Sequence, residues 1–125
     1  MLEIQTENAP SSPSPISQAV RAGDYIFVSG QTPRRPDGTE VSGDFDAEVR
    51  CVLDNVMAIL DAAGAGADRV CKVNAYLTDA RLFERFNAIH SEYFRSAPRP
   101  ARTTVVSSLA RPSIRVEVEA VAWLG

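Results

Sequence analysis

The apolar residues between Phe45 and Ala63 recur at intervals of three and four positions, and this spacing constrains the fold more than any other feature. It predicts one apolar stripe along an α-helix, made of Val49, Val52, Leu53, Val56, Ile59, Leu60 and Ala63. Asp44 or Asp46 is placed to cap the start of this helix. A helix with a single apolar face must bury that face against another layer, which the rest of the chain has to supply.

That layer is predicted to be a β-sheet. Runs rich in β-favouring residues occupy positions 3–6, 18–21, 25–29, 70–77, 103–106 and 114–123. A second amphipathic helix is expected over 80–94, with Asp79 as its N-cap. The order of elements is typical of an α+β fold, in which about six strands form one mixed sheet and both helices cover one face. We expect residues 1–125 to form a single domain.

Composition excludes several other classes of protein. Hydrophobic residues make up 45% and charged residues 23% of the 125 residues, as in ordinary globular domains. No apolar stretch approaches the ~20 residues that span a bilayer, and no signal-peptide pattern opens the chain, so we expect a soluble cytoplasmic protein. A net charge of −3 and a single lysine disfavour nucleic acid as a partner. Cys51, Cys71 and the single His90 do not have zinc-site spacing, so we expect no catalytic metal.

The second face of the predicted sheet is not clearly polar. Its expected residues include four large apolar ones, Tyr25, Phe27, Val105 and Trp123. Because a small soluble protein rarely leaves a large apolar face in water, we expect copies of the chain to cover this face in a homo-oligomer.

Short motifs run in order along almost the whole chain: ENAP, SQAV, GDYIFVSGQTP, LDNVMAILDAAG, VCKVNAYLTD, FNAIHSEYF, RPARTTV and VEVEAVA. In order and spacing they resemble the RidA/YjgF/YER057c/UK114 family. The resemblance implies a homotrimer whose sheets form a central barrel, with sites in clefts between subunits and no metal or organic cofactor. Arginine-bearing members of this family resemble enamine/imine deaminases, which hydrolyse 2-imino acids to 2-keto acids and ammonia.

Two residues match the positions that would carry this chemistry. Arg102, in RPARTT, matches the family's substrate-binding arginine, and a guanidinium holds a carboxylate through two parallel bonds. The alternative for Arg102 is a surface salt bridge. Glu117 matches the family's glutamate that handles the attacking water. In a regular strand Arg115, Glu117 and Glu119 share one face, so Glu119 is the rival acid.

Four further residues are candidate substrate-binding positions. Thr104 shares the strand face of Arg102, and Asn87, in FNAIH, matches a family asparagine near the site. Gly30 lets a ligand approach the backbone closely. Thr104 could equally be a β-favouring residue, Asn87 a local cap, and Gly30 a turn. Ile16 stands where the family usually has a site tyrosine, which indicates a changed substrate or weaker activity on small imino acids.

The remaining reactive side chains are interpreted as structural. His90 matches no catalytic position, and Cys51 and Cys71 are expected in or near the core. Ser29 lacks a nucleophile elbow and a triad partner. Three other functions stay open: a carboxylate-binding regulatory module, a deaminase of a larger enamine, and a ribonuclease or translation inhibitor, which the acidic net charge disfavours.

Overall fold

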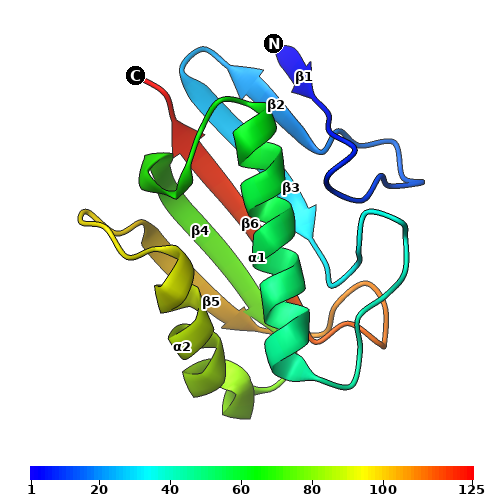
Figure 1. Ribbon diagram of the computed structural model, residues 1–125. Coiled ribbons are helices and arrows are strands. Elements are labelled where there is room, and N and C mark those ends of the chain that lie inside the picture. Colours follow the sequence, from blue (N-terminus) through cyan, green and yellow to red (C-terminus); the bar gives the residue numbers. More distant parts are fainter.

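The computed structural model describes residues 1–125 as one mixed six-stranded sheet with two α-helices on the same face (Figure 1). The elements are β1 (Leu2–Ile4), β2 (Ala19–Ala22), β3 (Tyr25–Gln31), α1 (Phe45–Ala62), β4 (Val70–Leu77), α2 (Phe83–Tyr93), β5 (Ala101–Val106) and β6 (Val116–Trp123). The strand order is β1-β2-β3-β6-β4-β5, and only the β4–β5 pair is parallel. The predicted α+β architecture is confirmed. Neither helix combines the length and apolar character that crossing a bilayer requires.

The long helix α1 forms where its apolar spacing predicts it. The Asp44 carboxylate accepts the backbone N–H of Ala47 at 3.2 Å and so caps the helix. At the other end Gly64 has a φ of 80°, a conformation that costs glycine little and ends the helix. The apolar stripe is buried against β3 and β6, and its buried members are Val49, Val52, Leu53, Val56, Ile59 and Leu60.

Several boundaries differ from the predicted ones. Residues Ala80–Leu82 form a 3₁₀ turn capped by Asp79, and the α-helix begins only at Phe83. Strand β1 is shorter and lies earlier than expected, whereas β3 continues through Gly30 to Gln31. Gly30 therefore lies inside a strand and does not close one.

The side chains of β6 alternate between the helix-bearing face of the sheet and the opposite face. Val116, Val118, Ala120 and Ala122 are buried beneath the helices. The intervening residues, Glu117, Glu119, Val121 and Trp123, consequently point to the opposite face. Tyr25, Phe27, Val105 and Trp123 are exposed, each by more than 40%. The structure thus leaves the predicted apolar residues uncovered in a single copy of the chain.

Two residues lie elsewhere than expected. Arg115 precedes β6, so strand alternation does not govern it, and its guanidinium donates to both carboxylate oxygens of Glu48 on α1 while lying 5.5 Å from the Phe45 ring centre. It does not share a face with Glu117. Cys71 is exposed, because it occupies a β-bulge between Val70 and Lys72. Only Cys51 is partly buried as predicted.

The ion pair between Arg115 and Glu48 predicts a specific stability result. The Glu48 side chain is 1% exposed, so removing its partner leaves a buried, unpaired carboxylate. We expect Arg115→Met to lower the free energy of unfolding by about 3 kcal/mol. The double variant Glu48→Met/Arg115→Met should recover most of that loss. Urea unfolding at one protein concentration measures both, and a loss below about 1 kcal/mol in the single variant would contradict the pairing.

Candidate active site

Arg102 projects from β5 toward α2. It is paired in register with Val73, a core residue, and so lies on the helix-bearing face. Its guanidinium carbon is 5.7 Å from the ring centre of Phe83 and 5.4 Å from that of Phe86. Four ion pairs form in the chain, and Arg102 is in none of them. The salt-bridge alternative for this residue is therefore wrong, and the cation is half-buried without a carboxylate partner.

Asn87 and Thr104 accompany Arg102. The Asn87 side-chain oxygen, on α2, accepts a hydrogen bond from Nη2 of Arg102, and this bond fixes the direction of the guanidinium. Thr104 is paired with Ala75 and lies on the same face, two residues along β5, as predicted. Burial lowers the pKa of Arg102, but arginine stays protonated in proteins. These three residues, the Arg102 half-site, can hold an anion.

Glu117 and Gly30 meet on the other face of the sheet. A Cβ atom added to Gly30 would lie 2.2 Å from Oε2 of Glu117. The absence of a side chain at position 30 thus lets the Glu117 carboxylate lie directly against the β3 backbone. The turn interpretation of Gly30 is wrong, and the group that approaches its backbone here is Glu117.

Hydrogen bonding distinguishes the two acids of β6. The Tyr76 hydroxyl donates to Oε1 of Glu119 at 2.5 Å, whereas no side chain or backbone group of the chain bonds the Glu117 carboxylate. Burial and the neighbouring charge of Glu119 raise the pKa of Glu117, and Arg111 opposes the rise. A carboxyl group with a raised pKa and no fixed partner is the better proton carrier near neutral pH.

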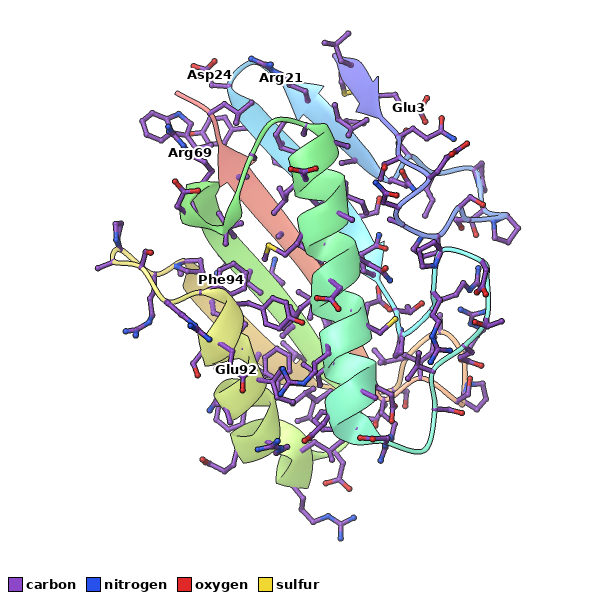
Figure 2. All side chains as sticks on the ribbon, viewed as in Figure 1. Glu3, Arg21, Asp24, Arg69, Glu92 and Phe94 are labelled. Carbon is purple, nitrogen blue, oxygen red and sulfur yellow. The ribbon has the colours of Figure 1, made fainter.

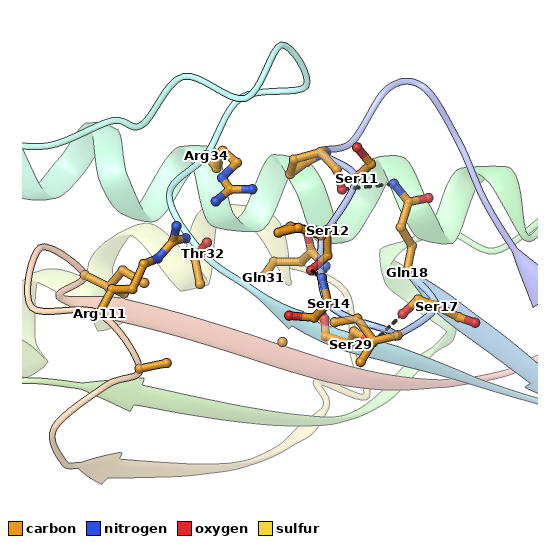
Figure 3. A pocket seen from close by; sticks show the side chains of 16 residues that line it. Ser11, Ser12, Ser14, Ser17, Gln18, Ser29, Gln31, Thr32, Arg34 and Arg111 are labelled. Atoms are coloured by element: carbon orange, nitrogen blue, oxygen red, sulfur yellow. Dashed lines mark hydrogen bonds between the residues drawn. The ribbon is translucent and has the colours of Figure 1, made fainter.

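A pocket of about 440 Å³ opens beside Gly30 (Figure 3). It lies between the N-terminal loop, the end of β3 and the loop before β6, and Ile16 lies on its wall with 59% exposure. Gln18 holds the N-terminal loop in place, because its side-chain amide donates to the carbonyls of Thr6, Ala9 and Pro10. The sequence pattern alone does not mark Gln18 as a functional residue, although it is part of the SQAV motif.

The sheet separates the two groups of candidate residues. Arg102 on β5 pairs with Val73 on β4, and Val73 pairs with Ala120 on β6. Ala120 is three residues from Glu117 along β6. Two strand spacings and three residues of rise put the two Cα atoms about 14 Å apart. Their side chains point to opposite faces. We call the second group, made of Ile16, Gly30 and Glu117, the Glu117 half-site. It therefore does not meet the Arg102 half-site within one chain.

Comparison with known proteins shows the family of this chain. The family model described as Endoribonuclease L-PSP matches residues 6–124, and a RutC family protein of Pyrococcus horikoshii is 42% identical over 96% of this chain and 95% of its own. The chain belongs to the RidA/YjgF family.

Solved structures of family members have the same fold. The crystal structure of RidA from an Antarctic Psychrobacter species has a TM-score of 0.92 at 33% identity and covers 98% of this chain and 99% of its own. Escherichia coli TdcF, crystallised with bound serine, has a TM-score of 0.94 at 31% identity over the full length of both chains.

The other reactive groups of this RidA-family chain are not arranged for catalysis. Nε2 of His90 is buried without a hydrogen-bond partner. The ring centre of His90 lies 5.6 Å from that of Phe86 and 4.6 Å from that of Phe94, and Figure 2 shows Phe94 at the end of α2. Burial, with a smaller effect of Arg102, lowers the pKa of His90 to about 4. Burial also raises the pKa of the Cys51 thiol. No three His, Cys, Asp or Glu side chains lie close enough together to hold a metal ion.

The pKa of His90 predicts a pH dependence of stability. Because the folded pKa, about 4, lies below the ordinary value of 6.5, the unfolded chain binds the proton first as the pH falls. Between pH 6.5 and 4, His90 should cost up to about 3 kcal/mol of stability. His90→Phe keeps the ring packing and should remove that part of the slope. Parallel pH profiles of unfolding for the two proteins would contradict this.

Proposed function

We propose that this protein hydrolyses 2-imino acids and their enamine tautomers to 2-keto acids and ammonia. The observation that carries the proposal is Arg102, a half-buried cation held by Asn87 and flanked by two phenylalanine rings, with no carboxylate of its own chain. A planar guanidinium in partly desolvated surroundings binds a substrate carboxylate strongly. Membership of the RidA/YjgF family supports the same reaction.

In the proposed mechanism, Arg102 holds the substrate carboxylate and Thr104 lines the same half-site. Glu117 takes a proton from a water molecule as its oxygen attacks the imine carbon. That proton is delivered to the imine nitrogen, which gives a carbinolamine. Glu117 then moves the hydroxyl proton of the carbinolamine to the same nitrogen, the carbon–nitrogen bond breaks, and ammonia leaves as the keto group forms. Because its pKa is raised, Glu117 is suited both to accept the proton from water and to donate a proton to nitrogen. Imines react readily with water, so positioning and electrostatics supply most of the rate enhancement.

This mechanism requires two copies of the chain. Arg102 and Glu117 lie on opposite faces of one sheet, about 14 Å apart at Cα, and a small imino acid cannot reach both. We propose a homotrimer in which the sheets form a central barrel and each cleft combines the Arg102 half-site of one subunit with the Glu117 half-site of the next. The exposed Tyr25, Phe27, Val105 and Trp123 would be covered in it.

A second candidate is a carboxylate-binding module without turnover. The structure of Escherichia coli TdcF with bound serine shows that a relative holds an amino acid, and Arg102 alone suffices to bind such a carboxylate. Endoribonuclease, which the family description names, is less well supported, because thirteen basic and sixteen acidic residues leave this chain acidic.

A coupled assay tests the deaminase. An amino-acid oxidase generates 2-iminobutyrate, and semicarbazide traps the imine that survives. We expect the wild type to reduce trapping, and Arg102→Ala and Glu117→Gln each to lower kcat/KM by about 100-fold, through loss of the carboxylate contact and of the proton carrier. Glu119→Gln, the matched control, should change it less than about threefold.

Arg102→Lys should not restore the rate, because an ammonium cannot make two parallel bonds to a carboxylate. Wild-type trapping equal to that of a blank, with carboxylates still bound, would favour the binding module. A loss in Glu119→Gln larger than that in Glu117→Gln would reverse the assignment of the acid.

A further inference from the structure

The pocket beside Gly30 is strongly biased in charge. Its sixteen lining residues include two arginines, Arg34 and Arg111, and no aspartate or glutamate. The whole chain, in contrast, has a net charge of −3. Arg34 comes from the loop after β3 and Arg111 from the loop before β6, and in Figure 3 their guanidinium groups point toward each other beside Thr32. Two like charges facing one cavity form a site for an anion.

Neither arginine is neutralised by the protein. Arg34 and Arg111 take part in none of the four ion pairs, and no hydrogen bond from either guanidinium forms in the chain. The nearest acid along the sequence, Asp37, accepts hydrogen bonds from the backbone N–H and the hydroxyl of Thr39. The next acid, Glu40, is paired with Arg34 only through the backbone. Its carboxylate instead accepts a hydrogen bond from the Ser113 hydroxyl at 2.8 Å. Both cations therefore remain available to a ligand.

The rest of the lining suits a polar ligand. The pocket carries side-chain hydroxyl groups, contributed by Ser11, Ser12, Ser14, Ser17, Ser29 and Thr32. Ser17 and Ser29 already donate hydrogen bonds, to Glu3 and to the Ser17 carbonyl. Ser11, Ser14 and Thr32 donate none within the chain, so these hydroxyls can solvate a bound carboxylate.

The pocket adjoins the proposed catalytic acid. Gly30 lines the pocket, and the Glu117 carboxylate lies against its backbone. The charge of Arg111 also acts on Glu117 and partly offsets the rise that burial and Glu119 cause in the pKa of that carboxyl. A substrate with its imine carbon at Glu117 would thus extend its side chain past Gly30 and Ile16 toward the two arginines.

Resting on the proposed function, we propose that Arg34 and Arg111 bind a second carboxylate and that the preferred substrates are 2-imino dicarboxylic acids. Water adds to the C=N bond, the C–N bond breaks and ammonia leaves, while both carboxylates are unchanged. Arg102 of one copy holds the carboxylate next to the imine. Arg34 and Arg111 of the other hold the carboxylate at the end of the side chain. Ile16 packs against the methylene groups between them.

Binding of product-like keto acids tests the proposal without turnover. Calorimetry compares 2-oxoglutarate with 2-oxobutyrate, which lacks the second carboxylate. The wild type should bind 2-oxoglutarate about tenfold more tightly or better, and Arg34→Gln/Arg111→Gln should abolish that preference. Arg34→Lys/Arg111→Lys should retain part of it. Arg35→Gln is the matched control, because Arg35 borders a different cavity, with Cys51 and Asp54.

Three binding results would overturn the proposal: equal affinity of the wild type for the two keto acids, a preference that survives in Arg34→Gln/Arg111→Gln, or a preference lost in Arg35→Gln. Tighter binding of 3-phosphonopyruvate than of 2-oxoglutarate would overturn the choice of a carboxylate as the second anion.

Turnover separates this proposal from the proposed function. Oxidases generate 2-iminoglutarate and 2-iminobutyrate, and the ratio of their kcat/KM values should fall about tenfold or more in Arg34→Gln/Arg111→Gln. Hydrolysis of 2-iminobutyrate with an unchanged ratio would overturn the dicarboxylate assignment and leave the deaminase standing. Hydrolysis of neither imine, with the binding preference intact, would overturn the deaminase and leave the second anion site standing.

Discussion

The single sheet layer, with its helices on one face only, determines where every candidate site residue of this protein lies. In β6 the small and β-branched residues fill the core, so the intervening Glu117 and Glu119 must face the other way. The parallel register of β5 with β4 places Arg102 beside the core residue Val73 and sends its side chain toward α2. The fold therefore builds two half-sites rather than one site, and assembly of copies becomes part of the proposed catalysis.

The charged residues of the core and of the candidate sites differ in whether the protein pairs them. Glu48, almost wholly buried, is bound by Arg115, as the high cost of an unpaired buried charge demands. Arg102, Arg34 and Arg111 have no such partner, and Glu117 lies against Gly30 with none either. Unpaired charges at the walls of these sites are the groups that remain free to bind a charged substrate and move its protons.

The sequence predicts the elements better than it predicts how they meet. The bounds of β4 and the start of α1 follow from hydrophobic spacing, because each buries one face for most of its length. The predictions for Arg115 and Cys71 are wrong because side chains alternate between the two faces only inside a regular strand. Arg115 precedes β6, and Cys71 lies at a bulge in β4.

The site follows the same rule. Family motifs make Arg102 and Glu117 candidates, but their opposite faces depend on how β5 pairs with β4, which no local pattern specifies. Arg34 and Arg111 lie in loops far apart in the sequence, and only the folded chain brings them to one pocket.

Mixing two inactive variants tests the central claim, a site shared between copies, most directly. Arg102→Ala and Glu117→Gln chains, unfolded and refolded together in equal amounts, should recover about a quarter of wild-type imine hydrolysis, since random assembly gives that share of clefts both intact groups. A mixture as inactive as its components, with mixed oligomers formed, would contradict the account.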